Sequence, residues 1–313
     1  MPSDFVDVRS LRVKPMVPAY DGPHPGPAGN RPQWLTAPAA VGGNYRSLKK
    51  LVTDLQLHTV CESAACPNLG DCWNRGTATF MILGNVCTRR CGFCAVQKGA
   101  PGPADYDEPR RVAEAVQAMG LRYAVITSVN RDDRKDGGAE LFALTIQAIR
   151  ERAPGCKVEV LVPDFQGSHA AMDIVLQARP DVLNHNIETV PRLYRQARIG
   201  SRYERSLDML LYAKTAGGDI PTKSGMMLGL GETDEEVIQV MTDLHAHRVD
   251  ICTIGQYLRP SRDHLPISKY YSPAEFARFK QAGDALGFGH VEAGPLVRSS
   301  YHADEAGEKT AAC

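Results

Sequence analysis

Three cysteines stand four and three residues apart in the segment "CTRRCGFC". Cys87, Cys91 and Cys94 come shortly after the apolar run "TATFMIL", residues 77–83. A structural zinc site takes four protein ligands, and a simple iron–sulfur cluster takes four cysteines. A local set of three therefore leaves one metal position open for an exogenous ligand. The alternative interpretation is a zinc site that a distant His or Cys completes.

A second set of three cysteines lies upstream in "CESAACPNLGDC", where Cys61, Cys66 and Cys72 follow the spacing CxxxxCxxxxxC. This spacing is too wide for a zinc knuckle and again supplies only three thiolates. Six of the nine cysteines lie between residues 61 and 94, and an odd total in a long chain favours metal or redox chemistry over a disulfide framework. The remaining three are interpreted as small buried side chains or, at the chain end, an idle thiol. They are Cys156, Cys252 and Cys313.

The composition excludes several classes of partner. The 313 residues contain 36 Lys plus Arg and 36 Asp plus Glu, so there is no global basic field for a nucleic acid or an anionic membrane. No stretch approaches 18 consecutive apolar residues, and the start "MPSDFVDVRS" lacks the charged-then-apolar order of a secretory signal. We expect a cytoplasmic protein that binds neither nucleic acid nor membrane.

Strand and helix patterns alternate from residue 77 onward. The strands are predicted at 78–83, 123–128, 157–163, 182–188, 222–229 and 251–257. The helices are predicted near 108–119, 138–152, 169–178, 204–217, 233–247 and 273–286. Such alternation implies parallel pairing through right-handed crossovers, which a doubly wound sheet also satisfies. Because segments with chemically active residues follow successive strands, and barrel loops gather on one face, we predict an α/β fold with a partial (β/α)6 barrel.

The chain is predicted to have four parts. Residues 1–43 are rich in Pro and Gly and form an extended or partly disordered arm. Residues 44–76 hold a short helical stretch and the upstream cysteines, 77–290 form the partial barrel, and 291–313 form a C-terminal segment.

The segment "CTRRCGFC" is similar to the CxxxCxxC signature of the radical S-adenosylmethionine (SAM) enzymes, including an aromatic residue, Phe93, before the last cysteine. The resemblance implies that Cys87, Cys91 and Cys94 hold a [4Fe–4S] cluster whose open iron takes the amino and carboxylate groups of SAM. One electron then yields a 5′-deoxyadenosyl radical, which removes a hydrogen atom from an unactivated carbon. The cofactor carries this chemistry, and the protein supplies placement and shielding.

The stretch "GMMLGLGE", residues 225–232, looks like the GxIxGxxE motif on the adenine side of that superfamily. It makes Gly225, Gly229 and Glu232 candidates for cofactor contacts. A glycine turn at a strand end, with an acidic residue before the next helix, explains the same letters.

Two polar residues in "HNIET", Asn186 and Glu188, are further candidates for ribose or methionine contacts. They follow the fourth predicted strand. A satisfied polar network in the core is the alternative interpretation.

The upstream cysteine set, followed fifteen residues later by CxxxCxxC, resembles the lipoyl synthase family, as does the segment "VRSSYHAD" at 297–304. The resemblance extends from "LHTVCE" to "RSSYHAD" and includes "SVNRDDRKDGGA" and "QYLRPS". It implies a second, auxiliary [4Fe–4S] cluster that a serine oxygen completes. Its predicted ligands are Cys61, Cys66, Cys72 and Ser300, with Ser299 as the alternative serine.

The family resemblance implies an enzyme that inserts two sulfur atoms at C6 and C8 of an octanoyl chain. That chain is carried on a lysine of a lipoyl carrier domain, in 2-oxoacid dehydrogenases or the glycine cleavage H protein. The two carbons are unactivated, so no side-chain base can remove their protons. The auxiliary cluster is the implied sulfur source. An electron donor such as flavodoxin or ferredoxin, and a carrier that rebuilds the cluster, are the other implied partners.

Other functions remain open from the sequence. A methylthiotransferase or biotin-forming enzyme is the nearest alternative among sulfur-inserting radical enzymes. A two-cluster electron-transfer protein is less favoured, because a ferredoxin-type run supplies four cysteines and ends in Cys-Pro, which "CGFCAV" does not. A zinc-bearing binding module would need tetrahedral ligand sets.

Overall fold

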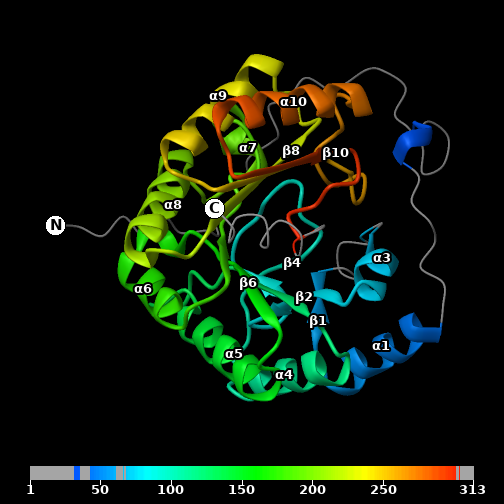
Figure 1. Ribbon diagram of the computed structural model, residues 1–313, viewed down its shortest axis with the longest axis vertical. Coiled ribbons are helices and arrows are strands. Elements are labelled where there is room, and N and C mark those ends of the chain that lie inside the picture. The colour runs from blue at the N-terminus through cyan, green and yellow to red at the C-terminus, as the bar shows by residue number, and fades with distance from the viewer. Residues whose placement is uncertain (1–31, 36–42, 61–65, 67, 301–302, 304–313) are drawn as a thin grey trace. The chain divides into compact units, whose positions relative to one another are not determined.

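The computed structural model describes residues 32–35, 43–60, 66, 68–300 and 303 of the chain (Figure 1). Most of the predicted arm at 1–43 lies outside the described residues, as does Cys61 of the upstream set. The predicted division into four parts is not tested by the structure and stays a prediction. The helical stretch predicted after residue 44 is confirmed by α1 (Gly43–Asp54), which a short 3-10 helix, η1 (Gln33–Leu35), precedes along the chain.

Eight strands form the main sheet: β1 (His58–Thr59), β2 (Thr77–Ile82), β5 (Tyr123–Ser128), β6 (Lys157–Leu161), β7 (Val182–Asn184), β8 (Thr222–Leu228), β9 (Ile251–Gln256) and β10 (His290–Gly294). They lie side by side in this order (Figure 1). Every neighbouring pair is parallel except β1 and β2. The six predicted strands are confirmed, whereas β1 and β10 are additions that the sequence pattern did not predict. Since β1 and β10 stand at opposite edges, the sheet is an open, partial barrel.

The predicted helices are also confirmed and lie outside the strands as an arc (Figure 1). They are α4 (Glu108–Ala118), α5 (Ala139–Arg152), α6 (His169–Gln177), α8 (Tyr203–Gly217), α9 (Asp234–Ala246) and α10 (Pro273–Leu286). Consecutive helices pack on one another along most of this arc. Capping residues in the sequence define several helix ends. Thr233 and Ser272 each form a capping box with the Glu three residues later, and Gly287 ends α10 in the left-handed conformation.

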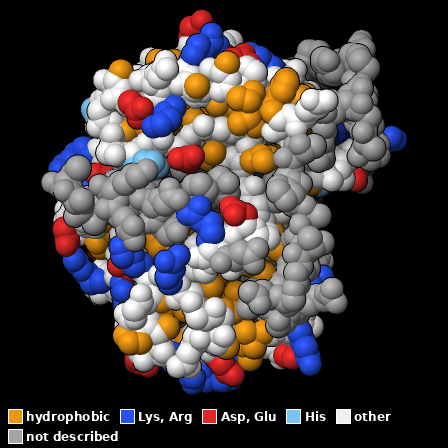
Figure 2. Space-filling model, turned by 45° about the vertical axis from the view of Figure 1, so that its right-hand side comes forward, with side chains coloured by type: hydrophobic (Ala, Val, Ile, Leu, Met, Phe, Trp, Pro, Cys, Tyr) orange, Lys and Arg blue, Asp and Glu red, His pale blue; other side chains and the backbone are white. Residues whose placement is uncertain are grey.

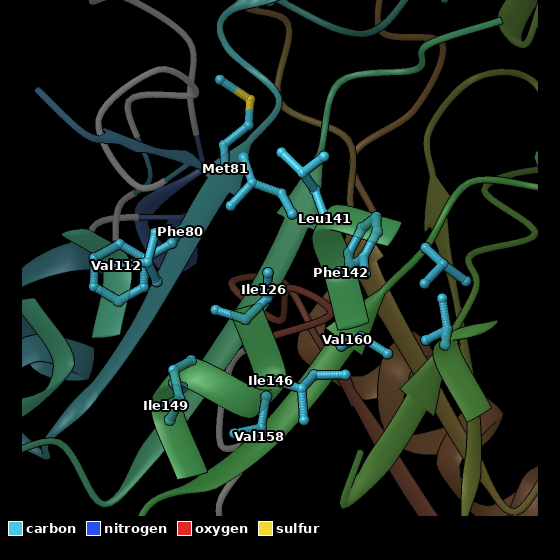
Figure 3. Packing of buried hydrophobic residues seen from close by; sticks show 14 of the residues in the cluster. Phe80, Met81, Val112, Ile126, Leu141, Phe142, Ile146, Ile149, Val158 and Val160 are labelled. Carbon is cyan, nitrogen blue, oxygen red and sulfur yellow. The ribbon is translucent and has the colours of Figure 1, made fainter. Parts of the chain in front are cut away.

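The face of the sheet toward the helices is apolar. Figure 3 shows Ile126 of β5 and Val158 and Val160 of β6 directed at Ile146 and Ile149 of α5, and all five are fully buried. Successive side chains of a strand point to opposite faces, so the apolar residues of one face alternate with those of the other. Burial of this face holds the helices against the strands.

The inner face of the sheet is polar, because Glu159 lies between two outward-facing valines of β6. Lys223 Nζ of β8 is 3.1 Å from each carboxylate oxygen of Glu159. Asn184 Nδ2 donates to the same carboxylate at 3.0 Å, and Tyr123 Oη donates at 2.9 Å. The exposed fractions of Lys223 and Glu159 are 1% and 0%, so this ion pair is satisfied entirely within the protein.

The chain after β10 contacts the inner side of the sheet at two places. The backbone of Val297 approaches Gly255 in β9 near the carboxyl edge, since a Cβ on Gly255 would lie 2.1 Å from Val297 O. Ala303 is fully buried and packs with Tyr123 and Val125, which lie toward the amino end of β5. The described residues of the C-terminal segment therefore contact the inner face at β9 and at β5.

Removing one partner of the buried Lys223–Glu159 ion pair should destabilise the folded protein. Lys223→Met leaves the Glu159 charge buried and unpaired, and we expect it to lower the free energy of unfolding by about 3–5 kcal/mol. The double variant with Glu159→Gln should recover most of that loss. Lys280→Met, which breaks the exposed pair with Asp284, should cost less than about 1 kcal/mol. Urea unfolding of the cluster-free protein measures all three, and equal costs for the two single variants would contradict the expectation.

Candidate metal and cofactor site

The CxxxCxxC cysteines lie in a loop that follows β2 at the carboxyl edge of the main sheet. Two short parallel strands, β3 (Val86–Cys87) and β4 (Gln97–Lys98), pair with one another and close the base of this loop. Within the loop, Cys94 N donates to Cys91 O at 3.3 Å, which folds the last two cysteines into one turn. The structure thus places the three thiols in one compact loop, as the spacing predicts.

The loop after β5 holds the first cysteine. Thr88 donates to Asn130 O through both its backbone N, at 3.1 Å, and its Oγ1, at 3.0 Å. Asn130 N in turn donates to Cys87 Sγ at 3.3 Å. The "SVNRDD" segment, predicted to converge on the same face, therefore contacts the cysteine loop directly.

Arg89 joins the cysteine loop to two further strand ends. Its Nε and Nη2 donate to the two oxygens of Asp132 at 2.7 and 2.8 Å, and Nη2 also donates to Asp164 at 2.5 Å. Arg89 is 5% exposed and Asp164 is 0% exposed. Burial alone would raise the pKa of Asp164, but the hydrogen bonds and charge of Arg89 lower it below the usual range. This paired network fixes the loop relative to β5 and β6.

Gly92 is held between two other segments. Its N donates to Ala197 O at 2.9 Å, at the end of the short helix α7 (Tyr194–Ala197), and its O accepts from Leu265 N at 3.0 Å. A Cβ at this position would lie 2.9 Å from both Gln196 O and Leu265 Cγ. A glycine is therefore required by close approach, and the loop after β9 closes over the cysteines.

Burial opposes ionisation of two of these thiols, Cys91 and Cys94. Burial raises the pKa of Cys91 to about 12, opposed by Arg198 and reinforced by Cys94 and Cys87. Burial also raises the pKa of Cys94, to which Cys87 adds. A bound metal supplies the positive charge that holds neighbouring thiols as thiolates. No described cysteine forms a disulfide, so the three thiols are available as ligands.

The donor set fits an iron–sulfur cluster with an open iron. Within the described residues, no group of three or more His, Cys, Asp or Glu side chains is already arranged around a point for a metal ion. The loop nevertheless offers three thiols from one turn and one short strand, with no fourth side chain beside them in the spacing. Three local thiols suit a cluster with one open iron better than a tetrahedral zinc site, which needs four protein ligands.

Asn186 and Glu188 lie together after β7. Asn186 Nδ2 donates to Glu188 Oε1 at 3.1 Å, and Glu188 has a left-handed φ of 67°. Burial raises the pKa of Glu188, while Arg198 and Asn186 oppose the shift. Asn186 Oδ1 is buried and has no hydrogen-bond partner among the described residues. A buried acceptor without a donor is a place where a polar ligand group would be favourable.

The glycine-rich turn after β8 is tightly structured. Gly225 O accepts from Glu188 N at 2.9 Å, so the glycine-rich turn is joined directly to the Asn186–Glu188 pair. Gly229 has φ of 110°, and a Cβ there would lie 2.3 Å from Gln256 Nε2. Glu232 accepts from the backbone N of Gly229 and Leu230 at 2.5 and 3.0 Å. The carboxylate of Glu232 thus stabilises its own turn, and its contact with a cofactor stays a prediction.

Phe93 is half-buried and packs against the apolar cluster that contains Tyr194 and Ala197. Its ring therefore supports the cysteine loop from the side of α7. The structure does not test its predicted contact with a cofactor.

Sequence reasoning missed several residues that surround the thiols. Arg198 is 8% exposed and donates to Tyr194 Oη at 3.1 Å and Ser206 Oγ at 3.0 Å. Lys98 Nζ and His264 Nε2 contact Cys94 O at 2.7 and 3.1 Å. No spacing rule identifies these residues, because their loops meet only in the fold. The one available signal was that they belong to the connections that follow strands β2, β7 and β9.

The part of the chain that holds Cys66 and Cys72 contacts the C-terminal segment. Cys66 and Cys72 flank the start of the short helix α3 (Leu69–Asn74), and Cys72 N donates to Asn68 O at 2.9 Å. Asn68 Nδ2 donates to Leu296 O at 2.6 Å. The two parts of the predicted auxiliary site, which are more than two hundred residues apart, are therefore in contact. Cys61 lies outside the described residues, so its role and that of Ser300 stay predictions.

Comparison with known proteins agrees with this geometry. The family model for the radical SAM superfamily matches residues 81–244, and that for the N-terminal domain of lipoyl synthase matches residues 16–66. A lipoyl synthase of Koribacter versatilis is 61% identical over 280 residues, covering 90% of this chain and 92% of that protein. A lipoyl synthase of Rubrobacter xylanophilus is 61% identical over 275 residues, covering 88% and 86%. The chain belongs to the lipoyl synthase family.

Membership of the radical SAM superfamily implies a [4Fe–4S] cluster and SAM as cofactors. Among solved structures, a methylornithine synthase superposes with a TM-score of 0.54 at 15% identity, over 78% of this chain and 81% of that one. At that identity the similarity concerns the fold alone, and it confirms the predicted partial barrel. Within the described residues, no helix is long and apolar enough to span a membrane.

The N-terminal arm belongs to the lipoyl synthase family pattern from residue 16 onward. Sequence reasoning found no motif in it. Its Pro and Gly content indicates an arm without regular periodicity, and such a segment carries no spacing rule that would reveal the family.

Gly92 offers a sharp test of the cysteine loop. Gly92→Ala should displace the loop, so that anaerobic reconstitution yields roughly four irons per chain in place of roughly eight, if each cysteine set holds a four-iron cluster. The matched control is Gly102→Ala, where a Cβ meets no atom within 4 Å. Iron and sulfide analysis of both variants is the measurement. Equal iron content in the two would show that close packing at Gly92 does not shape the site.

Proposed function

We propose that this chain is a lipoyl synthase that inserts two sulfur atoms at C6 and C8 of a protein-bound octanoyl chain. The observation that carries the proposal is the hydrogen bond from Asn68 to Leu296. It joins Asn68, which stands between Cys66 and Cys72 in the sequence, to Leu296 in the segment that also contains Ser300. A radical SAM enzyme with one cluster has no need for that contact, whereas a sulfur-inserting enzyme with a second cluster does.

The chain's own residues bind and orient the cofactors. Cys87, Cys91 and Cys94 would hold the first cluster, and the buried Oδ1 of Asn186 would accept a hydrogen bond from SAM. When bound, the cluster and SAM supply one-electron chemistry that removes a hydrogen atom from an unactivated C–H bond. Arg89 keeps the cysteine loop in place through its two aspartates. Fixed placement matters because the radical step tolerates little misalignment.

The second set would hold the sulfur donor. Cys61, Cys66, Cys72 and Ser300 are the proposed ligands of an auxiliary [4Fe–4S] cluster. Oxygen is a harder ligand than thiolate and is more easily protonated, so a serine-bound iron is easier to release. A cluster that gives up its sulfide in each reaction needs such a weak point.

The proposed partners follow from this chemistry. The substrate is an octanoylated carrier domain of a 2-oxoacid dehydrogenase or the glycine cleavage H protein. An electron donor such as flavodoxin or ferredoxin would reduce the clusters, and a cluster carrier would rebuild the auxiliary one. No described cysteine forms a disulfide, which fits a reducing compartment, and we place the enzyme in the cytoplasm.

Heavy sulfide provides the test of the whole proposal. The protein is reconstituted with isotopically labelled sulfide and supplied with SAM and an octanoylated carrier domain. The mass of the lipoyl product is then measured by mass spectrometry. Both inserted sulfurs should carry the label. Changing Cys87, Cys91 and Cys94 to Ala should abolish SAM cleavage, because the open iron is lost. Changing Cys66 and Cys72 to Ala should leave SAM cleavage intact and abolish lipoyl formation.

The matched control for these cysteine variants is Cys252→Ala, which removes a fully buried thiol of β9 that belongs to neither set. It should keep both activities. Unlabelled product, or lipoyl formation that survives loss of Cys66 and Cys72, would remove the second set from sulfur transfer.

The serine ligand is tested separately. Ser300→Cys should retain the auxiliary cluster, because thiolate binds iron well, and should slow sulfur transfer by holding that iron more firmly. Ser299→Cys is the matched control and should transfer sulfur at the unsubstituted rate. Single-turnover assays with cluster quantification give both readouts. The reverse pattern would assign the ligand to Ser299.

A further inference from the structure

The chain leaves β2 through a turn of two left-handed residues. Leu83 has a φ of 68°, and Gly84 has a φ of 85°. A leucine in this region is strained, and such strain persists only where the surrounding contacts hold it. Cys87 comes soon after this turn in the sequence, so the direction that the turn gives to the chain decides where the first cysteine lies.

A buried glutamate from another element holds the turn. Glu108 is the first residue of α4, is 4% exposed and accepts from Leu83 N through Oε2 at 2.7 Å. Burial raises the pKa of Glu108, and backbone hydrogen bonds from Leu83 and Gly84 oppose that shift. Successive N–H groups point to opposite sides of an extended strand, so one carboxylate receives both only where the backbone turns. The hydrogen bonds therefore favour the left-handed conformation.

The side chain of Leu83 is held from a second direction. Leu83 is 3% exposed, and a Cβ on Gly138 would clash with Leu83 Cδ1. Gly138 has a φ of 94° and directly precedes α5, so a glycine there leaves room for the leucine. The turn is thus enclosed by one residue from the start of each of two helices that pack on one another, α4 and α5.

The segment before α4 is itself joined to the loop and helix that follow β5. Gly102 O accepts from Arg131 Nη2 at 3.0 Å. Tyr106 Oη donates to Glu140 Oε2 of α5 at 2.8 Å. Because the loop after β5 also contacts the cysteine loop, the start of α4 is placed relative to the same frame that holds the thiols.

We propose that Glu108 is a positioning residue for the first cluster, which acts through the Leu83–Gly84 turn on the place of Cys87. The carboxylate orients the two N–H groups, the turn directs the chain into β3, and β3 carries Cys87 to the base of the cysteine loop. Loss of the carboxylate would leave buried donors without this acceptor, at a cost that a different turn would relieve. The inference rests on the first cluster of the proposed function.

The first test removes the acceptor. Glu108→Ala should lose the first cluster and keep the second, so that anaerobic reconstitution yields roughly four irons per chain in place of roughly eight. Glu108→Gln retains an acceptor oxygen and should recover most of the lost iron. The matched control is Glu275→Ala, which removes another glutamate from the first turn of a helix, where it accepts from Ser272 N. The control should keep both clusters.

Electron paramagnetic resonance shows which cluster is lost. SAM binds the open iron of the first cluster, so its addition should change the signal of that cluster when reduced. This response should be absent in Glu108→Ala and present in Glu108→Gln. Full iron with a normal response to SAM in Glu108→Ala would overturn the proposal. Equal loss of both clusters, or a Gln variant as defective as the Ala variant, would overturn it too.

A second pair of variants reaches the turn from the leucine side and keeps the test open if Glu108→Ala does not fold. Gly138→Ala places a methyl group against Leu83 and should also lose the first cluster selectively. The control is Gly120→Ala, where φ is 59° and a Cβ meets no atom within 4 Å. Both variants put alanine into left-handed backbone, so only the contact with Leu83 differs. Equal iron content in the two would contradict the role of the turn.

These experiments separate the inference from the proposed function. If changing Cys87, Cys91 and Cys94 to Ala abolishes SAM cleavage while Glu108→Ala keeps the first cluster, the cluster assignment stands and the role of Glu108 is wrong. If the triple variant retains SAM cleavage, the cluster assignment itself fails, and the proposal for Glu108 fails with it.

Discussion

One buried guanidinium fixes the cysteine loop, and much of the site depends on it. Arg89 comes from the loop after β2, Asp132 follows β5, and Asp164 follows β6. Two hydrogen bonds to Asp132 give a fork geometry that tolerates little rotation. Because Asp164 is fully buried, removal of Arg89 would leave a charge without a partner. The hydrogen bonds of Asn130 with Cys87 and Thr88, and of Gly92 with Ala197 and Leu265, require the cysteine loop to stay in this position.

The two faces of the open barrel differ in polarity. The outer face is apolar and is stabilised by burial against the helices (Figure 3). The inner face carries Glu159, Lys223 and Asn184, and the Glu159 carboxylate accepts hydrogen bonds from the other two. Figure 2 shows a surface on which Lys, Arg, Asp and Glu are interspersed, in agreement with a net charge of zero. The candidate site residues lie at the carboxyl edge and on the inner side of the sheet.

Local patterns predicted the fold well and the contacts around the site poorly. Apolar runs and capping residues located six strands and their helices, because these signals are encoded within a few neighbouring residues. The strand β10 was missed, since "HVEAG" is short and partly polar and pairs with β9 only in the assembled sheet. The cysteine spacing predicted the loop. Arg198 could not be predicted, because it becomes a site residue only through its burial near Cys91 in the assembled fold.

Glu232 shows why a motif can be correct and still leave its chemistry open. The spacing of "GMMLGLGE" suits a cofactor-binding turn, and it equally suits a carboxylate that accepts from two backbone N atoms of its own turn. The structure shows the second arrangement. Both readings are compatible, since a carboxylate that shapes the turn also places the glycine backbone where a ligand would approach. Sequence alone cannot separate these roles because they use the same residues.

The described residues of the two cysteine sets are joined to different parts of the protein, and the difference suits their proposed roles. The CxxxCxxC loop is joined to β5, β6, α7 and the loop after β9 by side-chain and backbone bonds. In the upstream set, Cys72 lies in α3, a helix of six residues, and Cys66 precedes that helix. Asn68 joins this part of the chain to the C-terminal segment. A cluster that persists through many reactions needs a fixed frame. A cluster that is dismantled in each reaction is better placed where loss of its iron leaves the barrel, its buried ion pairs and its apolar core intact.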